Sequence, residues 1–380
     1  MKTVLVTGAD GFMGRNLKLG LEQYEDLKII TFSRKNKPEE LEGYLQQADL
    51  VYHLAGINRP ENPEEFETGN AGLTETIVDI LGKNNLKPDI VFSSSIQALK
   101  DNPYGKSKKQ AEDTLLKYRE ESGAQVYIYR LPNVFGKWSR PNYNSVVATF
   151  CYNICRGLPI TISDPNNQLE LVYIDDVVKA FTGILSEKLI GGEGAPAVKA
   201  AEEGFFTVPR TFCLTLGELA QQLYHIRDNR EKLTVPDFSH DLTRCLYATY
   251  LSFLDKKDFS RALDLKTDQR GSLAEVVKSE SFGQIFVSSS HEGVMRGNHY
   301  HHTKVEKFCV IKGEAVIKFR KLDEEEVLSY EVSGDKPEVV DIPPGYTHAI
   351  ENLTRGEMIV LFWANQIFDP ENPDTYYCEV

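Results

Sequence analysis

A glycine-rich turn between a strand pattern and a helical pattern constrains the fold of this chain most strongly. The first residues form the short apolar run KTVLVTGA, which is typical of a buried parallel strand. The motif TGADGFMG spans Thr7–Gly14, and helical spacing begins at Phe12. In such a turn Gly8 permits a tight bend, Gly11 lets the backbone approach a pyrophosphate, and Gly14 allows close helix–sheet packing. The motif therefore predicts a dinucleotide-binding turn, with the phosphates at the helix N-terminus.

Strand and helix patterns then alternate along the chain. Further strands are expected at 27–32, 50–54, 89–92 and 126–131, and helices at 12–23, 70–81 and 104–121. This alternation predicts βαβ units and a parallel sheet covered on both faces. Thr215 and Glu218 form a capping box that starts another helix. The stretch 191–210, rich in Gly and Ala, is expected to be a surface loop.

The pattern changes after about residue 250, where short strand-like runs are separated by Gly and Pro turns. This change is typical of an antiparallel sandwich or barrel. A chain of 380 residues also exceeds the usual size of one hydrophobic core. We therefore predict an α/β Rossmann-type doubly wound parallel sheet over residues 1–250, followed by an all-β barrel over 255–380.

The end of the second strand indicates which cofactor is used. An NAD enzyme places Asp or Glu there, whereas this chain has Thr31-Phe32-Ser33-Arg34-Lys35. Arg34 and Lys35 could neutralise a 2′-phosphate, which favours NADP(H); the alternative is that both are solvated surface cations. The residues expected to bind the cofactor are Gly8, Asp10, Gly11, Phe12, Met13, Gly14, Ser33, Arg34, Leu54, Ala55, Gly56, Tyr104 and Lys108.

Tyr104 and Lys108 are spaced so that they share one face of a helix. A nearby ammonium favours phenolate and lowers the pKa of a phenol, so this pair suits proton transfer. Three serines, Ser93–Ser95, end the preceding strand and could polarise a substrate carbonyl.

Four side chains in the C-terminal part have the character of metal ligands. In a strand, His299 and His301 point to one face, while Tyr300 and His302 point away. Glu306 adds a carboxylate, and His348 comes from a distant strand. Three imidazoles and one carboxylate suit a divalent transition metal with an open position.

The N-terminal motifs resemble those of the extended short-chain dehydrogenases/reductases. TGxxGxxG, SSS and YxxxK occur in the order and spacing of that family. The resemblance implies that Tyr104 is the general acid/base, that Lys108 lowers its pKa, and that Ser95, or alternatively Ser94, orients the carbonyl. It also implies substrate contacts from RLPNVFG, which contains Arg130 and Asn133. Dehydratases of this family have an Asp-Glu pair after the orienting residue, where this chain has Ile96-Gln97.

The C-terminal motifs resemble those of the cupins. The pattern G(x)5HxH(x)3,4E(x)6G matches from Gly293 to Gly313, and most of a second cupin motif matches from Pro343 to Asn352, although Pro337 replaces its first glycine. The segment RGNH also resembles metal-free sugar epimerases, in which its His is the base and Arg296 would contact substrate. If His299 instead binds metal, the base is left open among Lys304, Lys307 and nearby tyrosines.

Over both domains the chain resembles the bifunctional capsular polysaccharide and O-antigen nucleotide-sugar enzymes of the CapF type. The resemblance implies a UDP-2-acetamido-2,6-dideoxy-4-keto-hexose that is epimerised at C3 in the cupin and reduced at C4 in the first domain. The product would be UDP-N-acetyl-6-deoxy-L-talosamine, a precursor of N-acetyl-L-fucosamine. It also implies zinc and a homodimer joined through the cupins. Two alternatives remain: a reductase whose cupin is a structural, dimerisation or ligand-binding module, and a cofactor-sensing regulator without turnover.

Composition argues against several other partners. The net charge is −13, and no run of Lys or Arg forms a nucleic-acid or anionic-lipid patch. No stretch approaches the roughly 20 apolar residues that a membrane span needs. Six scattered cysteines and a start that lacks a signal peptide's apolar core lead us to expect a cytoplasmic protein.

Overall fold

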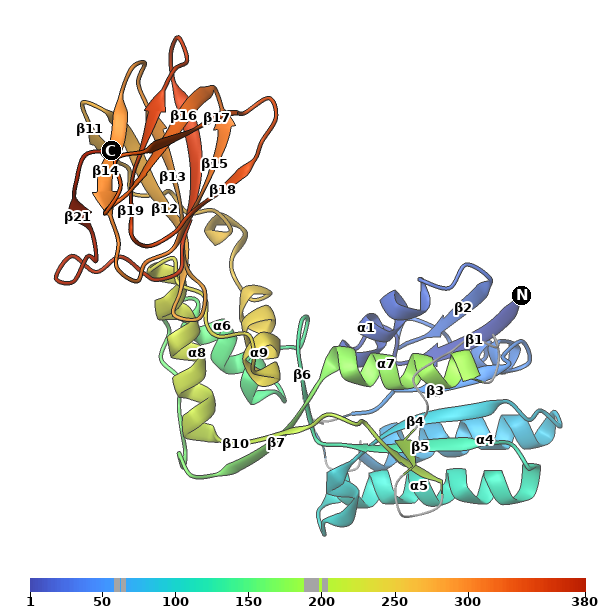
Figure 1. The fold of residues 1–380 in the computed structure, drawn as a ribbon. Coiled ribbons are helices and arrows are strands. Elements are labelled where there is room, and N and C mark those ends of the chain that lie inside the picture. The colour runs from blue at the N-terminus through green and yellow to red at the C-terminus, as the bar shows by residue number, and fades with distance from the viewer. Residues whose placement is uncertain (58–61, 63–65, 188–197, 200–203) are drawn as a thin grey trace. The chain divides into compact units, whose positions relative to one another are not determined.

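The computed structural model describes residues 1–57, 62, 66–187, 198–199 and 204–380, and its contacts divide the chain into two compact units (Figure 1). Unit 1 comprises Met1–Leu223 and Cys245–Leu254, and unit 2 comprises Tyr224–Arg244 and Asp255–Val380. The domain limits 1–250 and 255–380 stay predictions. Within the described part of the chain, no helix has the length and apolar character needed to cross a membrane.

A mostly parallel sheet forms the centre of unit 1. Among the described residues its order is β2-β1-β3-β4-β5-β9-β8. These strands are β1 (Lys2–Thr7), β2 (Leu27–Phe32), β3 (Leu50–His53), β4 (Asp89–Ser95), β5 (Val126–Leu131), β8 (Val198–Lys199) and β9 (Phe205–Thr207). Pairing is parallel from β2 to β9, and only the short β8 is antiparallel to its neighbour. The strand order reverses at β1, so the carboxyl ends of β1 and its neighbours form the switch point where α/β folds bind ligands.

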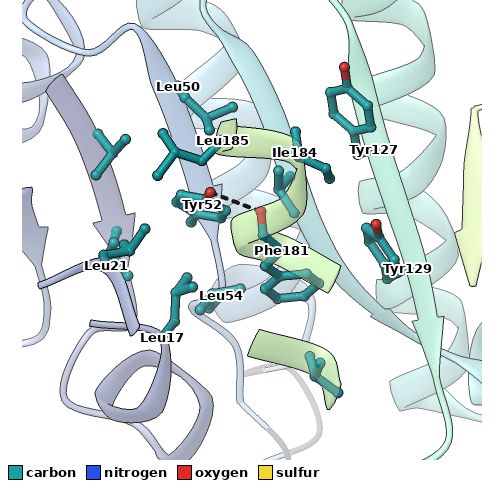
Figure 2. Close-up of a cluster of buried hydrophobic side chains, with 14 of the residues drawn as sticks. Leu17, Leu21, Leu50, Tyr52, Leu54, Tyr127, Tyr129, Phe181, Ile184 and Leu185 are labelled. Atoms are coloured by element: carbon teal, nitrogen blue, oxygen red, sulfur yellow. Dashed lines mark hydrogen bonds between the residues drawn. The ribbon is translucent and has the colours of Figure 1, made fainter. Parts of the chain in front are cut away.

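Helices cover both faces of this sheet, as predicted. They are α1 (Phe12–Leu21), α2 (Glu40–Leu45), α4 (Leu73–Lys83), α5 (Pro103–Ser122) and α7 (Ile174–Leu185), with a π-helical turn η1 (Glu67–Gly72) and a 3-10 turn η2 (Ile96–Leu99). One buried cluster joins the sheet to α1 and α7, and a second joins it to α2, α4 and α5. Figure 2 shows the first cluster, where the Tyr52 hydroxyl donates to the Phe181 carbonyl at 3.0 Å. Burial on both faces explains why the strands are apolar without alternation.

The glycine-rich stretch differs from the prediction of a surface loop. Residues 191–197 and 200–203 lie outside the described residues, but Phe205–Thr207 forms β9 and pairs in parallel with β5. Phe205 is buried, so its packing against the sheet outweighs the loop-like composition around it. By contrast the capping box is confirmed: the Thr215 N–H donates to Glu218 at 2.7 Å, and the Glu218 N–H donates to Thr215 at 3.1 Å.

Among the described residues, the remaining elements up to residue 258 are a small sheet, three α-helices and a 3-10 turn. In the described chain the sheet order is β10-β7-β6, with β6 (Asn133–Phe135), β7 (Gln168–Tyr173) and β10 (Phe212–Thr215). The helices are α6 (Val146–Ile154), α8 (Leu216–Glu231) and α9 (Asp241–Leu251), and η4 (Lys256–Asp258) is a 3-10 turn.

Unit 2 contains two antiparallel sheets, as the strand-like runs predicted. One has the order β11-β12-β13-β20-β15-β18 and the other β17-β16-β19-β14-β21. The strands are β11 (Lys266–Asp268), β12 (Gly271–Ser279), β13 (Gly283–Ser290), β14 (Met295–Tyr300), β15 (Glu306–Lys312), β16 (Glu314–Lys321), β17 (Val327–Ser333), β18 (Val339–Ile342), β19 (Tyr346–Asn352), β20 (Met358–Ala364) and β21 (Tyr376–Tyr377). Side chains from both sheets, among them Phe308, Phe319 and Phe362, share one buried core. The unit is therefore a two-sheet β-barrel of the jelly-roll kind.

Candidate functional sites

The glycine turn after β1 has the geometry that a dinucleotide site needs. Gly8 has φ +69°, and a Cβ on it would lie 2.7 Å from the Ala55 backbone nitrogen. A Cβ on Gly14 would lie 2.3 Å from the Gly8 carbonyl oxygen. Gly11 is the N-cap residue of α1, so it adds no side chain between the first-turn N–H groups and a ligand. Phe12 and Met13 begin α1 behind this turn, and Met13 packs against the first core cluster.

A buried hydrogen-bond chain that sequence reasoning did not identify holds the next part of the cofactor edge, Leu54–Gly56. The Leu54 and Ala55 N–H groups both donate to the Thr7 hydroxyl at 3.2 Å. His53 bridges Thr7, 2.8 Å from Nδ1, and Thr74, 2.9 Å from Nε2. Because the Thr74 hydroxyl donates to a backbone carbonyl, Nε2 of His53 carries the proton. Burial and the Lys108 charge lower the pKa of His53 to about 3, so the ring stays neutral.

At the end of β2 the structure adds a carboxylate that the local sequence lacks. Asp10, from the glycine turn, accepts from the Ser33 hydroxyl at 3.1 Å and lies 2.8 Å from the Lys35 ammonium. Hydrogen bonds from Lys35 and Ser33 lower the pKa of Asp10. Arg34 is exposed beside this group. Of the two cations expected to face a 2′-phosphate, Lys35 is therefore already paired with an anion.

Tyr104, Ser95 and Lys108 come together at the carboxyl end of β4. The Ser95 hydroxyl lies close enough to the Tyr104 phenol to lower its pKa, and the buried Lys108 ammonium donates to the Ser93 carbonyl at 3.0 Å. Gly105 makes this approach possible, because a Cβ there would lie 2.3 Å from the Gln97 carbonyl oxygen of η2.

Burial shifts the pKa values of both titratable groups of this site. It raises the pKa of Tyr104, and the neighbouring Ser95 hydroxyl only partly offsets this. It also lowers the pKa of Lys108 to about 8, against a smaller opposing effect of Glu112. The Lys108 ammonium is directed to the Ser93 carbonyl in this structure.

Ser94 and Arg130 belong to a separate buried network centred on Glu112. The Ser94 hydroxyl donates to the Glu112 carboxylate at 2.6 Å, and Arg130 donates to it through Nε and a terminal nitrogen at 2.7 Å. Glu112 is fully buried, and the Arg130 guanidinium lies 3.9 Å from the Phe205 ring centroid. Ser95, rather than Ser94, is thus the serine beside Tyr104. Sequence reasoning missed Glu112, although it follows Lys108 by four residues on the same helical face.

Asn70 and Asn133 have different environments. Asn70 accepts from the Ile57 N–H at 2.8 Å and donates to Ser107 at 3.0 Å, which ties the loop after β3 to α5. Asn133 is exposed at the start of β6 and donates to the Glu170 carbonyl at 3.1 Å.

In unit 2 the four predicted metal ligands converge between the two sheets. One ligand atom from each of His299, His301, Glu306 and His348 lies within 4.8 Å of the others. A bulge between Gly297 and His299 in β14 sets His299 opposite His348 of β19, while Glu306 comes from β15 in the other sheet. His302, which was expected to point away, is exposed and packs edge-on against Tyr376.

The donor chemistry of this cluster fits a divalent metal. The Nδ1 of His301 donates to the Asp374 carbonyl at 2.6 Å, which leaves its Nε2 as a free acceptor 3.3 Å from the Glu306 carboxylate. The Nε2 of His348 is buried without a hydrogen-bond partner and lies 3.6 Å from the same carboxylate. Acceptor nitrogens around a buried carboxylate are the arrangement that zinc-type sites use.

The expected base candidates lie around this cluster in different ways. Lys307 follows Glu306 in β15, so its side chain points to the opposite face of the sheet, where it is exposed and pairs with Asp341. Lys304 is buried, and its ammonium donates to the Pro373 carbonyl at 2.5 Å and to Thr375 at 3.1 Å. Arg296, the expected substrate contact, donates to the Ser290 hydroxyl at 2.9 Å.

Comparisons with known proteins identify both parts of the chain. Residues 4–194 match the NAD dependent epimerase/dehydratase family, and residues 266–376 match the polysaccharide biosynthesis C-terminal domain. The chain belongs to the NAD dependent epimerase/dehydratase family. Its C-terminal domain makes it a two-domain member of the CapF type.

Full-length relatives support this assignment. The chain is 45% identical over 377 residues to UDP-2-acetamido-2,6-beta-L-arabino-hexul-4-ose reductase of Pseudomonas aeruginosa, covering 99% of this chain and 98% of that protein. A crystal structure of capsular polysaccharide assembling protein CapF from Staphylococcus aureus is 48% identical, with a TM-score of 0.90, and covers 99% of this chain and 100% of that one. A UDP-glucuronic acid 4-epimerase from Bacillus cereus is 17% identical with a TM-score of 0.55 over 66% of this chain and 98% of its own, which shows a shared fold.

Proposed function

We propose that the chain is a bifunctional nucleotide-sugar enzyme. Unit 2 epimerises C3 of a UDP-2-acetamido-2,6-dideoxy-4-keto-hexose, and unit 1 reduces the C4 ketone with NADPH to UDP-N-acetyl-6-deoxy-L-talosamine. The observation that carries the reductase is the convergence of Tyr104 and Ser95 beside the buried Lys108, at the carboxyl end of β4. The name of the Pseudomonas aeruginosa relative, which matches the whole chain, supports the substrate class.

The residues of unit 1 supply the proton and hold the ketone. Ser95 donates a hydrogen bond to the C4 oxygen, and Tyr104 gives its phenolic proton to that oxygen as negative charge develops there. Lys108 stabilises the phenolate that remains, because its charge is screened little at a buried site. NADPH, which residues Gly8–Gly14 would hold, would supply the hydride to C4.

The residues of unit 2 prepare C3. His299, His301, Glu306 and His348 would hold the metal, for which we propose zinc. A divalent ion held there would polarise the C4 carbonyl, which would acidify the neighbouring C3–H bond. The outward direction of Lys307 and its pairing with Asp341 argue against it as the base. A homodimer joined through unit 2 is proposed from the resemblance alone.

Replacement of one phenol tests the reductase. We expect Tyr104→Phe to lower the turnover of NADPH with the 4-keto sugar by about 10²–10⁴-fold while the Kd for NADPH stays within a few-fold. Tyr118→Phe is the matched control, since Tyr118 lies on the same helix with its hydroxyl bonded to the Pro88 carbonyl at 2.9 Å. Equal turnover in Tyr104→Phe and wild type would rule out Tyr104 as the acid. NADPH binding by the wild-type chain without turnover would favour the regulator instead.

A further inference from the structure

The last residues of the chain contact the proposed metal site at several points. We call residues Pro373–Cys378 the C-terminal strap. Within it β21 pairs antiparallel with β14, so that Tyr377 lies opposite His299 and Tyr376 opposite Tyr300. The Cys378 N–H donates to the Asn298 carbonyl at 2.9 Å, next to His299. Thr347, next to His348, donates its hydroxyl to the Cys378 carbonyl.

Asp374 is the strap residue with the densest set of contacts. Its backbone carbonyl accepts from Nδ1 of His301 at 2.6 Å. Its carboxylate accepts from the N–H groups of His302 at 3.0 Å, Thr303 at 2.9 Å and Lys304 at 2.8 Å, and from the Thr303 hydroxyl at 2.9 Å. One residue therefore binds both the ring of a candidate ligand and the backbone of the turn that follows it.

The backbone of Asp374 adopts a conformation that requires support. Its φ is +40°, which is uncommon for a residue with a side chain. The ammonium of Lys304 donates to the Pro373 carbonyl and to Thr375, on either side of Asp374. The carboxylate and these flanking bonds together hold the carbonyl where it meets His301.

We propose that Asp374 is a positioning residue of the metal site. Its carbonyl selects the tautomer of His301 that leaves Nε2 free as a ligand atom, and its carboxylate fixes the turn 302–304 between His301 and Glu306. Such outer contacts to a ligating imidazole set ring orientation and are typically worth 10–100-fold in metal affinity. The inference rests on the proposed metal site, and it adds a role for a residue about 70 positions away in sequence.

Zinc affinity tests the role without any measurement of catalysis. The Kd of the full chain for zinc is measured by competition with a chromophoric chelator, for wild type, Asp374→Asn and Asp369→Asn. An Asn side chain is close in size, but its NH2 group cannot accept from the Thr303 and Lys304 N–H groups. Asp369 is the matched control, because its carboxylate accepts only the nearby Glu371 N–H among the bonds described for it, at 3.0 Å.

We expect Asp374→Asn to raise the Kd for zinc by about 10–100-fold and Asp369→Asn to leave it within about twofold. The visible absorption of the cobalt-substituted Asp374→Asn chain should also shift, as the geometry around His301 loosens. A zinc Kd and cobalt spectrum unchanged in Asp374→Asn would overturn this proposal alone, as would equal weakening by Asp369→Asn. A wild-type chain that takes up no zinc would overturn the metal site itself and the proposal with it.

Discussion

The buried pair of Arg130 and Glu112 offers a quantitative test of how unit 1 holds its catalytic helix. Glu112 lies on α5, four residues after Lys108, with no exposed surface, and Arg130 reaches it from β5 at 2.7 Å. Arg130→Met removes the guanidinium over Phe205 and leaves a buried carboxylate whose remaining described partners are the Ser94 hydroxyl and, 4.0 Å away, the Lys109 ammonium. Breaking one side of a buried pair typically costs about 3–5 kcal/mol. We expect a loss at the lower end of this range, about 3 kcal/mol, because the Ser94 hydrogen bond persists. This loss corresponds to roughly a 100-fold change in the unfolding equilibrium constant.

Urea unfolding of unit 1 measures this loss. The chain has two tryptophans, Trp138 in unit 1 and Trp363 in unit 2, so Trp363→Phe leaves fluorescence that reports on unit 1. In that background Asp113→Asn is the control, because the Lys109–Asp113 pair is exposed and should contribute less than about 1 kcal/mol. The reasoning is refuted if Arg130→Met costs under about 1 kcal/mol. It is also refuted if the double variant Arg130→Met/Glu112→Leu, which removes both charges, destabilises more than Arg130→Met alone.

Three other outcomes follow from the sites. Burial lowers the pKa of Lys108 from 10.5 to about 8, so between these pH values the unfolded chain binds more protons than the folded chain. The free energy of unfolding of wild type should therefore rise by about 3 kcal/mol relative to that of Lys108→Met from pH 8 to 10.5, as measured by parallel urea titrations. Asp10→Asn removes the carboxylate that pairs with Lys35 and so leaves the Lys35 ammonium to a 2′-phosphate. Calorimetry should therefore give a several-fold lower Kd for NADPH and little change in the Kd for NADH, and equal changes for both would contradict a 2′-phosphate site there. Removal of zinc by a chelator should lower the thermal midpoint of unit 2 and leave NADPH affinity unchanged, and an unaltered midpoint would contradict a metal held by His348 and its neighbours.

Local patterns in the sequence were enough for much of the fold. The strands 27–32 and 126–131 were predicted with the ends they have, because each is a short run dominated by apolar and aromatic residues. The helix expected at 104–121 is α5 (Pro103–Ser122), with Pro103 in its first turn. The side-chain oxygen of Asn102 caps it by accepting from the Gly105 N–H at 2.8 Å. Strand alternation likewise predicted that His299 and His301 face one side, and the structure brings both into one cluster.

Contacts between distant segments explain what the sequence did not reveal. Asp10 reaches the end of β2 from another loop, so a search for a carboxylate on β2 itself could not find it. Glu112 gains its role from Arg130 on a different strand, and Asp374 gains its role from the turn after His301. β9 forms within a glycine-rich stretch because Phe205 packs into the sheet core. In each case the decisive partner is remote in sequence, where periodicity carries no information.

Proton exchange at C3 tests the central claim most directly. The full, zinc-loaded chain is incubated with a UDP-4-keto-6-deoxy-N-acetylhexosamine in D2O without NADPH, and deuterium at C3 is followed by NMR. We predict exchange by wild type and by Tyr104→Phe, and loss of exchange in His348→Ala, because unit 2 alone would labilise C3. A zinc-loaded wild-type chain that reduces the ketone when NADPH is added, yet leaves hydrogen at C3 unexchanged, would contradict the account and leave a reductase with a structural or binding cupin.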